Sequence, residues 1–513
     1  MRHLDSLRSA FLSLAAFISL GFSGCATNTT ADAGAVDFLI EASPANLDPR
    51  IGTDAYSERI HGLLYSSLLS HDAQMNPAPD LAERWEMWDS KTYVFHLRRG
   101  VRFHTGEVLS SADVKYTFDS ILSGAVKTPK RGAFRTVESV SAPDESTVLF
   151  HLREPDASFL WNLTRPGIGI VPKSAGFEIA QHPNGTGPFR FVEMTADEEV
   201  TLEANPDYFG GRPRINRLRL RIVPDGTVRA LELRKGSADL AFNSLTPDMT
   251  VALERYSGIA ITQEPGTTLA YVAFNFDDSV LRHKEVRQAL AYATDRATLI
   301  RYLLRGQARP AASLLPPNHW AYEPNVRQYD YDPSRAEKLL DGAGFPRRVD
   351  GIRLHLTLKT STEESTRLLS AALQDQWRRV GVALELRPLE FATFYSDITR
   401  GSFQLYTQRW VGGNNDPQIF EYVFSSRKFP PNGANRGHYR NPDLDSLLDR
   451  AGAEPHREKR REIFSAVQKI VAEDAPYINL WYMDNICVHR QRVANVELSP
   501  TGDYDFLERI TVE

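Results

Sequence analysis

The alternation of strand-like and helix-like segments between residues 353 and 410 constrains the fold of this chain more than any other feature. Two segments with a helical apolar pattern separate three strand-like runs; in chain order the five are 353–358, 362–380, 382–386, 391–399 and 403–410. Regular alternation of strands and helices is typical of a parallel, doubly wound sheet. We therefore expect an α/β domain in this part of the chain.

The third strand-like run leads directly into residues 408–417, which read Gln-Arg-Trp-Val-Gly-Gly-Asn-Asn-Asp-Pro. Gly and Asn tolerate positive φ and leave backbone amides accessible. Ligands of open α/β sheets bind beyond the carboxyl ends of strands. We expect Trp410 to pack on a ligand and Gly412, Gly413 and Asn414 to offer backbone and amide groups. An ordinary turn beside a core tryptophan is the alternative.

Length and charge narrow the class of protein. The chain has 513 residues, enough for two or three domains with a large core. Lys and Arg number 60 against 65 Asp and Glu, so the net charge of −5 argues against a nucleic-acid partner. Two cysteines are too few for a disulfide framework or a cysteine-rich metal site.

The first 35 residues indicate export and anchoring. Arg2 and Arg8 precede an apolar run, 10–22, that is too short to span a bilayer. The run ends in Phe-Ser-Gly before Cys25, which resembles a bacterial lipobox whose cysteine is acylated after cleavage. We expect a lipoprotein signal peptide, 1–25, and a flexible tether, 26–35, in a cell-envelope protein. A buried cysteine in an uncleaved apolar helix is the alternative.

No catalytic motif is evident. The sequence contains neither a His-Glu-x-x-His nor a Walker Gly-x-x-x-x-Gly-Lys motif, and its 13 histidines lack metal-ligand spacing. We predict no catalytic residues, no metal site and no cofactor, and expect capture of a solute without chemistry.

Several short blocks together indicate a family. They read Pro-Asp-Leu-Ala-Glu-Arg-Trp at 79–85, Val-Arg-Phe-His-Thr-Gly at 101–106, Ala-Asp-Val at 112–114, Gly-Thr-Gly-Pro-Phe at 185–189, Asn-Pro-Asp-Tyr-Phe-Gly-Gly at 205–211, Ala-Phe-Asn at 273–275, Val-Arg-Gln-Ala-Leu at 286–290 and Tyr-Asp-Pro at 331–333. In this order they resemble the family 5 extracellular solute-binding proteins, the peptide, oligopeptide and nickel binders that serve ABC importers. The resemblance covers nearly everything after the tether.

The resemblance implies a bilobal periplasmic-binding-protein fold of type II, with an extra subdomain in the first lobe. Lobe I would combine residues 36–55, 188–266 and 483–513, and the extra subdomain would be 56–187. Lobe II would be 267–482. Two crossings between the lobes would allow closure around a ligand by a hinge.

Further binding residues follow from residue type and from the resemblance. Asn275 ends a strand in the expected hinge block, and Tyr271 lies on the same face by the two-residue period of a strand. Asp48 and Arg50 lie in a loop that borders the cleft in this family, and Lys359 ends a lobe II strand where it could meet an anionic group. Structural roles remain open for all of them: a hinge bond, core packing or solvated loop charges.

One departure from the family bears on the ligand. Peptide-binding members typically have an Asp three residues after the matching Trp, where it holds the peptide ammonium by a charge-assisted hydrogen bond. This chain has Gly413 at that position. Either Asp416 or Glu421 replaces the missing carboxylate, or the ligand lacks a free amino terminus.

The resemblance therefore implies the substrate-binding component of an ABC importer. It would act as a monomer, capture a small solute, most simply an oligopeptide, and deliver it to a permease and ATPase complex, touching the membrane only through its lipid anchor. An oligosaccharide, an opine or a metal chelate as ligand, and a sensor accessory role, remain open. A surface hydrolase, the alternative from another class, would need a nucleophile–base pair or a metal site.

Overall fold

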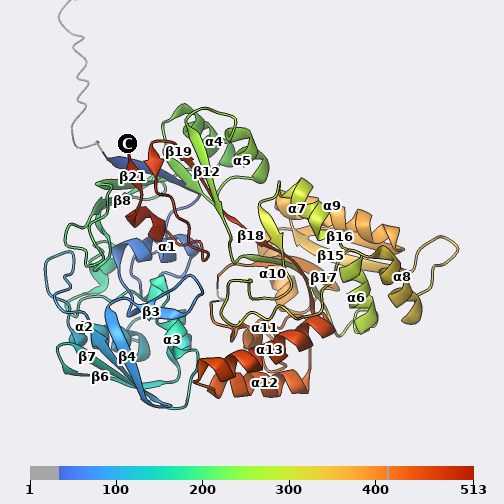
Figure 1. The fold of residues 1–513 in the computed structure, drawn as a ribbon, viewed down its shortest axis with the longest axis horizontal. Coiled ribbons are helices and arrows are strands. Elements are labelled where there is room, and N and C mark those ends of the chain that lie inside the picture. Colours follow the sequence, from blue (N-terminus) through green and yellow to red (C-terminus); the bar gives the residue numbers. More distant parts are fainter. Residues whose placement is uncertain (1–33, 413–414) are drawn as a thin grey trace, which may run out of the picture.

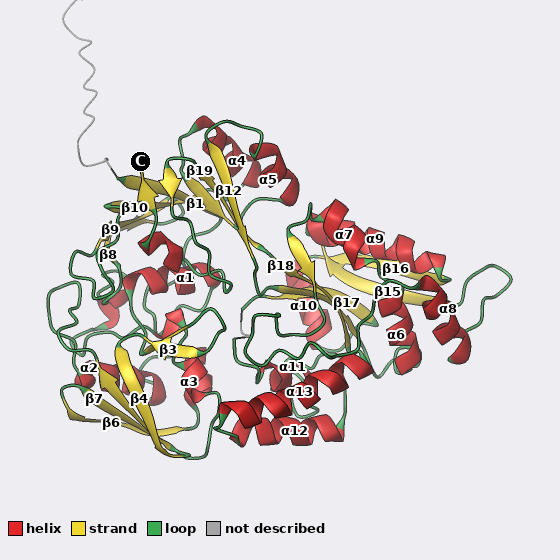
Figure 2. Ribbon diagram, viewed as in Figure 1, coloured by secondary structure: helices red, strands yellow, loops and turns green. Residues whose placement is uncertain are grey.

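The computed structural model describes residues 34–412 and 415–513, so the predicted signal peptide, Cys25 and nearly all of the tether lie outside the described residues. Three β-sheets organise the chain (Figures 1 and 2). A seven-stranded sheet and a six-stranded sheet form separate bodies. A four-stranded sheet lies beside the first of them, at the lower left of both views.

The seven-stranded sheet takes strands from both ends of the chain. Its order is β12-β19-β11-β1-β10-β9-β8. These strands are β1 (Ala35–Ile40), β8 (Phe189–Thr195), β9 (Glu199–Ala204), β10 (Arg217–Ile222), β11 (Leu240–Phe242), β12 (Ile259–Glu264) and β19 (Asn485–Arg490). The central strand β1 pairs in parallel with β10 and β11 and is buried along nearly its whole length, which explains why all of its residues except Asp37 are apolar.

The six-stranded sheet has the order β14-β18-β13-β17-β15-β16. Its strands are β13 (Leu269–Phe274), β14 (Ala308–Pro310), β15 (Leu354–Ser361), β16 (Val382–Leu389), β17 (Leu405–Trp410) and β18 (Tyr477–Met483). β15 is parallel to β16 and β17, as the alternation predicts. The complete sheet is mixed, because β13, which lies outside that alternation, is antiparallel to both of its neighbours, β17 and β18.

Helices cover both faces of the six-stranded sheet. One face packs on α6 (Lys284–Tyr292), α7 (Arg296–Leu303), α8 (Pro333–Gly342) and α9 (Glu364–Arg379). The other packs on α10 (Phe391–Thr399), α11 (Ile419–Phe424), α12 (Pro442–Ala453) and α13 (Arg457–Asp474). Successive side chains of β13 point to opposite faces of the sheet. Val272 packs in the core with α6 to α9, and Tyr271 packs in the core with α10 to α13.

The four-stranded sheet, of order β4-β5-β7-β6, forms the core of the extra subdomain with α2 (Ser111–Leu122). Its strands are β4 (Ala82–Asp89), β5 (Thr92–Leu97), β6 (Val137–Asp144) and β7 (Thr147–Leu152). The Ser-Ser-Ala-Asp sequence at 110–113 has the form of a capping box, and in the structure Ser110 caps α2 and Asp113 completes the box.

Two local sequence patterns in this subdomain predict structures that do not form: Leu-Ala-Glu-Arg-Trp at 81–85 favours a short turn of helix, and Val-Arg-Phe at 101–103 favours a strand that pairs back on the strand-like run 92–97. The segment 81–85, expected as a helical turn, belongs mostly to β4, because β5 offers it a full antiparallel partner. The segment 101–103 does not pair with β5, since β4 and β7 occupy both edges of that strand. Arg102 instead forms an isolated bridge with Val108.

Further helices and strands are short. They are α1 (Ala55–Leu64), β2 (Leu69–His71), β3 (Pro77–Pro79), α3 (Phe159–Asn162), α4 (Gly226–Lys235), α5 (Pro247–Leu253), β20 (Val493–Ala494) and β21 (Thr511–Val512). Some of them, such as α1, α4 and α5, pack on the seven-stranded sheet. None of the helices in residues 34–412 and 415–513 is long and apolar enough to cross a membrane.

Two connections join the large sheets. One is the short segment 265–268 between β12 and β13, and the other is Asp484 alone, between β18 and β19. The carboxylate of Asp484 accepts hydrogen bonds from Arg309 Nε at 3.0 Å and from Gln263 Nε2 at 2.7 Å. The connections are therefore short and fixed by polar contacts, while the cores of the two sheets are separate.

Candidate functional site

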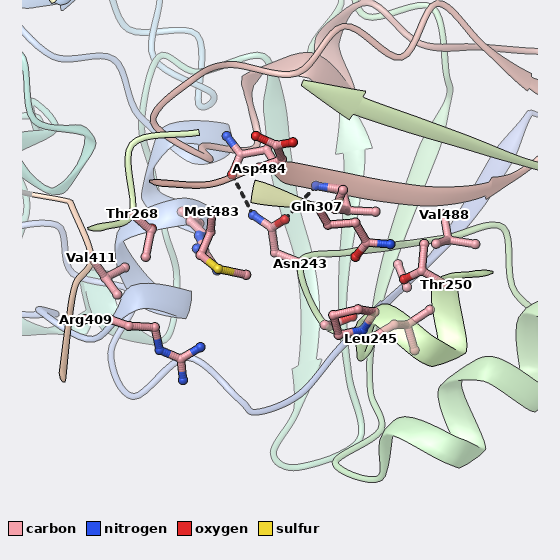
Figure 3. Close-up of a pocket in the computed structure, with 16 residues that line it drawn as sticks. Asn243, Leu245, Thr250, Thr268, Gln307, Arg409, Val411, Met483, Asp484 and Val488 are labelled. Atoms are coloured by element: carbon pink, nitrogen blue, oxygen red, sulfur yellow. Dashed lines mark hydrogen bonds between the residues drawn. The ribbon is translucent and has the colours of Figure 1, made fainter. Parts of the chain in front are cut away.

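A cavity of about 200 Å³ lies where the two large sheets meet (Figure 3). Asn243, Leu245 and Thr250 line it from the side of the seven-stranded sheet, and Gln307 and Arg409 from the side of the six-stranded sheet. Thr268, Met483 and Asp484, which belong to the connections between the sheets or lie next to them, form its third wall. The cavity is thus a cleft between two lobes.

The turn after β17 reaches this cavity. Val411 lines it and is 64% exposed, and Gly412 has a φ of +65°, the conformation that the glycine-rich sequence predicts. Gly413 and Asn414 lie outside the described residues. Arg409, which precedes Trp410, donates from one nitrogen to both carboxylate oxygens of Glu363, at 2.8 Å each.

The far end of the turn is fixed by buried polar contacts. His319 Nε2 donates to the backbone oxygen of Asn415 at 2.9 Å, and its Nδ1 accepts from the Ala321 amide at 3.0 Å. Burial lowers the pKa of His319 to about 4, so the ring is neutral. The Asp416 carboxylate pairs with the buried Arg460 guanidinium at 2.8 Å.

Asp416 and Glu421, the proposed replacements for the missing Asp, both have protein partners. Asp416 is held by Arg460 and accepts from the Gln418 amide at 3.1 Å. Glu421 lies 3.2 Å from the Lys428 ammonium and accepts from Gln418 Nε2 at 2.8 Å. A ligand ammonium would have to compete with these partners.

Trp410 ends a stack of aromatic rings. Its ring lies 6.1 Å from that of Tyr271 at an angle of 14°, and Tyr271 lies 4.3 Å from Tyr477 at 11°. Tyr271 is fully buried and Trp410 partly exposed, so Trp410 is the outer ring and Tyr271 supports it from the core. This arrangement favours a supporting role for Tyr271 over direct ligand contact.

Asn275 and Lys359 are engaged within lobe II. The Asn275 amide donates to the backbone oxygens of Gly401 and Phe403, at 3.1 and 2.8 Å, and its oxygen accepts from the Asp277 amide. The Lys359 ammonium pairs with Asp397 at 2.7 Å. A ligand role for either residue would require these bonds to break.

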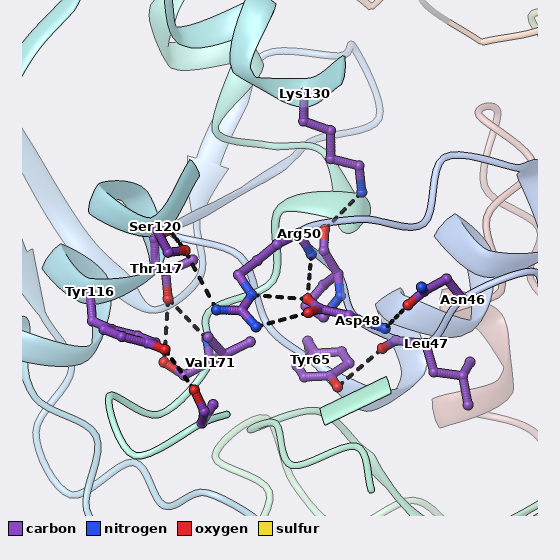
Figure 4. Close-up of polar contacts among 12 residues, drawn as sticks. Asn46, Leu47, Asp48, Arg50, Tyr65, Tyr116, Thr117, Ser120, Lys130 and Val171 are labelled. Carbon is purple, nitrogen blue, oxygen red and sulfur yellow. Dashed lines mark hydrogen bonds and ion pairs between the residues drawn. The ribbon is translucent and has the colours of Figure 1, made fainter. Parts of the chain in front are cut away.

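Asp48 and Arg50 form a buried ion pair (Figure 4). The Asp48 oxygens accept from Arg50 Nε at 3.0 Å and from Nη2 at 2.8 Å, and the two residues are 1% and 2% exposed. Lys130 Nζ donates to the backbone oxygen of Pro49 between them, at 2.7 Å. The pair therefore fixes the loop in place, and the alternative of solvated loop charges is wrong.

Sequence reasoning missed most of the cavity lining. Asn243 follows β11 with a φ of +52°. Its side-chain nitrogen donates to the side-chain oxygen of Asn485, and its side-chain oxygen accepts from the Ile486 amide, so it links the end of β11 to β19. The signal was present, since polar residues directly follow a buried strand. It could not be used because the partners in the cavity come from segments more than 200 residues apart.

Arg436 was also missed. It lies in the loop between α11 and α12, is 8% exposed, and packs between Tyr395 and Trp410, with its guanidinium carbon 5.2 and 5.9 Å from the two ring centres. Its Nη2 donates to the Tyr395 hydroxyl at 3.0 Å. An arginine in an irregular loop carries no sequence signal that predicts burial.

A second contact joins the extra subdomain to lobe II. The rings of Trp161, at the end of α3, and Trp320 stack at 5.7 Å, and the Arg460 guanidinium lies 5.0 Å from the Trp161 ring centre. Arg457 Nε donates to Asn76 Oδ1 at 3.1 Å, and the Ala157 amide donates to the Gly452 oxygen at 3.0 Å. We call this set of contacts the interlobe contact.

Within residues 34–412 and 415–513, no group of three His, Cys, Asp or Glu side chains could hold a metal ion. The described cysteine, Cys487, is buried and free.

Two α/β lobes with short connections and a cleft between them define a bilobal solute-binding protein, a class that closes around its ligand by a hinge. The chain belongs to the bacterial extracellular solute-binding proteins, family 5, because the model described as "Bacterial extracellular solute-binding proteins, family 5 Middle" matches residues 76–430.

Proteins similar to this chain are named for different ligands. The chain is 26% identical over 505 residues to a dipeptide-binding protein of Escherichia coli, covering 93% of this chain and 94% of the relative. It is 28% identical over 463 residues to heme-binding protein A of Haemophilus influenzae, covering 85% and 84%. The structure of CtaP of Listeria monocytogenes, described as an ABC transporter substrate binding protein, superposes with a TM-score of 0.84 at 26% identity, covering 93% and 99%.

These comparisons confirm the family resemblance, the bilobal α/β fold class and the expectation of a binding protein rather than an enzyme. The domain boundaries and the individual binding residues stay predictions.

Proposed function

We propose that this protein is the substrate-binding component of an ABC importer, which captures a peptide-sized solute between its lobes and delivers it to a membrane permease. The observation that carries the proposal is the cleft between the two large sheets, bordered by the turn after β17. Family membership and the similarity to a dipeptide-binding protein and to an ABC transporter substrate binding protein support it.

The lobes in this proposal are those that the sequence predicts. Residues 36–55, 188–266 and 483–513 contribute the seven-stranded sheet, and 267–482 contribute the six-stranded sheet. The extra subdomain, 56–187, meets lobe II at the interlobe contact. These surfaces are in contact in this structure, and opening of the lobes would separate them, with the connections at 265–268 and Asp484 acting as the hinge.

The anchoring proposal concerns residues outside the structure. We propose that Cys25 is acylated and that residues 26–35 tether a monomeric binding protein to the cell envelope, since the sequence before Cys25 has the form of a signal peptide.

The site favours a ligand that is not held by its amino terminus at the turn after β17. Gly413 replaces the Asp of peptide-binding members, and both nearby carboxylates, Asp416 and Glu421, already pair with basic residues. Either the amino terminus binds elsewhere in the cleft or the ligand lacks a free one.

Thermal unfolding of the soluble protein starting at residue 34 tests the proposal. Peptides of two to six residues, with free and with acetylated amino termini, are compared. A ligand at about 100 times its Kd adds roughly 2.7 kcal/mol to the free energy of unfolding, which gives a measurable rise in midpoint. We expect free and acetylated peptides to raise it equally.

Three other results would narrow or change the proposal. A response to free peptides alone would show that another carboxylate reads the ammonium. If no peptide raises the midpoint and hemin does, the ligand resembles that of heme-binding protein A instead. A response to neither would overturn the peptide assignment.

A further inference from the structure

Arg436 is a buried cation that has no anionic partner within residues 34–412 and 415–513. Its guanidinium donates to the Tyr395 hydroxyl at 3.0 Å and lies against the rings of Tyr395 and Trp410. No described carboxylate forms an ion pair with it. Because Tyr395 is itself 45% exposed, this arrangement lies at the edge of the lobe rather than deep in its core.

The other buried arginines in the described parts of the chain are compensated. Four of them pair with a carboxylate: Arg50, Arg229, Arg353 and Arg460. The fifth, Arg287, donates to four backbone oxygens. Burying an uncompensated charge is costly, so a chain retains one only where something else repays the cost. A ligand anion is one such compensation.

Further hydrogen-bond donors belong to the same cluster of rings. Among the described residues, the hydroxyls of Tyr271 and Tyr406 and the indole Nε1 of Trp410 are buried without a hydrogen-bond partner. Burial raises the pKa of the Tyr271 hydroxyl well above 10, so it is a neutral phenol at neutral pH. The charge on Arg436 therefore has no negative neighbour among these rings.

Contacts between aromatic rings connect Arg436 to the turn after β17, which the sequence predicts to contact the ligand. Trp410 stacks on Tyr271, and the Tyr271 and Tyr406 rings meet edge to face at 5.9 Å. The next residue after Trp410, Val411, lines the cleft. Arg436 therefore contacts the end of β17 that corresponds to the site where peptide-binding members of the family hold an ammonium group.

We infer that Arg436, with the rings of Trp410 and Tyr395, forms a subsite for a carboxylate of the ligand. The planar guanidinium can donate two parallel N–H bonds to a carboxylate, and the aromatic rings keep it in position. The charge recognised at this end of the cleft is then opposite to the ammonium that an Asp would hold. The inference rests on the proposed function and deepens it: the solute is a peptide-like molecule with an anionic group near Trp410.

Matched peptides test the inference by isothermal titration calorimetry. The probes are Glu-Ala-Ala against Gln-Ala-Ala, Ala-Ala-Glu against Ala-Ala-Gln, and Ala-Ala-Ala against its amide, with glutarate as a carboxylate that is not a peptide. We expect at least one acidic probe to bind tenfold or more tightly than its neutral partner. In Arg436→Gln that preference should vanish, while the neutral partner keeps its affinity within about threefold.

Two further variants separate binding from folding. Arg440→Gln is the matched control, because Arg440 lies in the same loop and over a ring, Phe429, but is exposed and pairs with Asp277 at 3.1 Å. It should keep the acidic preference. Arg436→Met should unfold at the same temperature as the wild type or higher without ligand, whereas a purely structural role for Arg436 predicts a lower midpoint.

The outcomes distinguish this inference from the proposed function. If neutral and acidic peptides bind equally well, or if Arg436→Gln keeps the preference, the carboxylate subsite is overturned and peptide capture stands. If glutarate binds through Arg436 and no peptide does, the subsite stands and the peptide assignment falls. If no probe binds, both are overturned.

Discussion

Trp161 offers a direct test of closure, because its ring joins the extra subdomain to lobe II. It stacks on Trp320 at 5.7 Å and receives the Arg460 guanidinium at 5.0 Å. An aromatic pair contributes about 0.5–1.5 kcal/mol beyond the burial of its area, and a cation over a ring contributes about 0.5–2 kcal/mol. Trp161→Ala should therefore weaken the closed state by roughly 1–3 kcal/mol.

The weakening should appear in two measurements. A coupling of about 1–3 kcal/mol corresponds to a roughly 5- to 150-fold loss of affinity for whichever ligand the titrations identify. Without ligand, small-angle X-ray scattering should give a larger radius of gyration for Trp161→Ala than for the wild type, because the open state gains population.

Trp88→Ala is the matched control, since Trp88 lies on β4 of the same subdomain and is 63% exposed. It should change neither quantity. Trp161→Phe, which keeps a ring, should fall between Trp161→Ala and the wild type. Wild-type affinity and wild-type dimensions in Trp161→Ala would refute the reasoning and show that the interlobe contact does not control closure.

Three other changes test the remaining features. Asp416→Asn leaves the Arg460 guanidinium buried without its carboxylate and should cost about 3 kcal/mol in urea unfolding, against less than about 1 kcal/mol for the exposed Asp449→Asn; equal losses would contradict this. The pKa of His319 is lowered to about 4, so the unfolded chain takes up the proton first and stability is lost as pH falls from about 6.5 toward 4. Between pH 7.5 and pH 5, the thermal unfolding midpoint should fall less in His319→Asn than in the wild type. An identical fall would refute the lowered pKa of His319. Cys25→Ala should move the protein from the membrane fraction to the soluble fraction of cells, and unchanged membrane association would exclude the lipid anchor.

The sequence predicted helices and strands well where the residues that determine them are neighbours in the chain. The helix at 391–399 has the predicted bounds, and α2 begins at the predicted capping box. The segment 81–85 failed because its conformation depends on pairing with β5, which no pattern within five residues can report. Strand propensity is set by neighbours across the sheet, so such errors concentrate at sheet edges.

The candidate site was predictable only in part. The turn after β17 could be found, because Gly and Asn signal positive φ after a strand, and Gly412 has it. The polar residues chosen by their position at strand ends were less informative: Asn275 satisfies backbone oxygens of its own lobe. Arg436 could not be found, since its burial depends on Tyr395 and Trp410, which lie 41 and 26 residues away in the sequence.

The position of β19 has a consequence for the order of folding. This strand comes from residues 485–490, yet it lies between β11 and β12 inside the seven-stranded sheet. The strands of the extra subdomain and of lobe II are each contiguous in sequence and can pair as soon as they are synthesised. The lobe that begins the chain therefore completes its sheet last. Until then β11 lacks a partner along one edge, and β12, an edge strand, lacks the strand with which it pairs. A chain that ends at Asp484, after β18 has completed the six-stranded sheet, should leave two finished bodies attached to an open sheet, a ready substrate for chaperones and proteases.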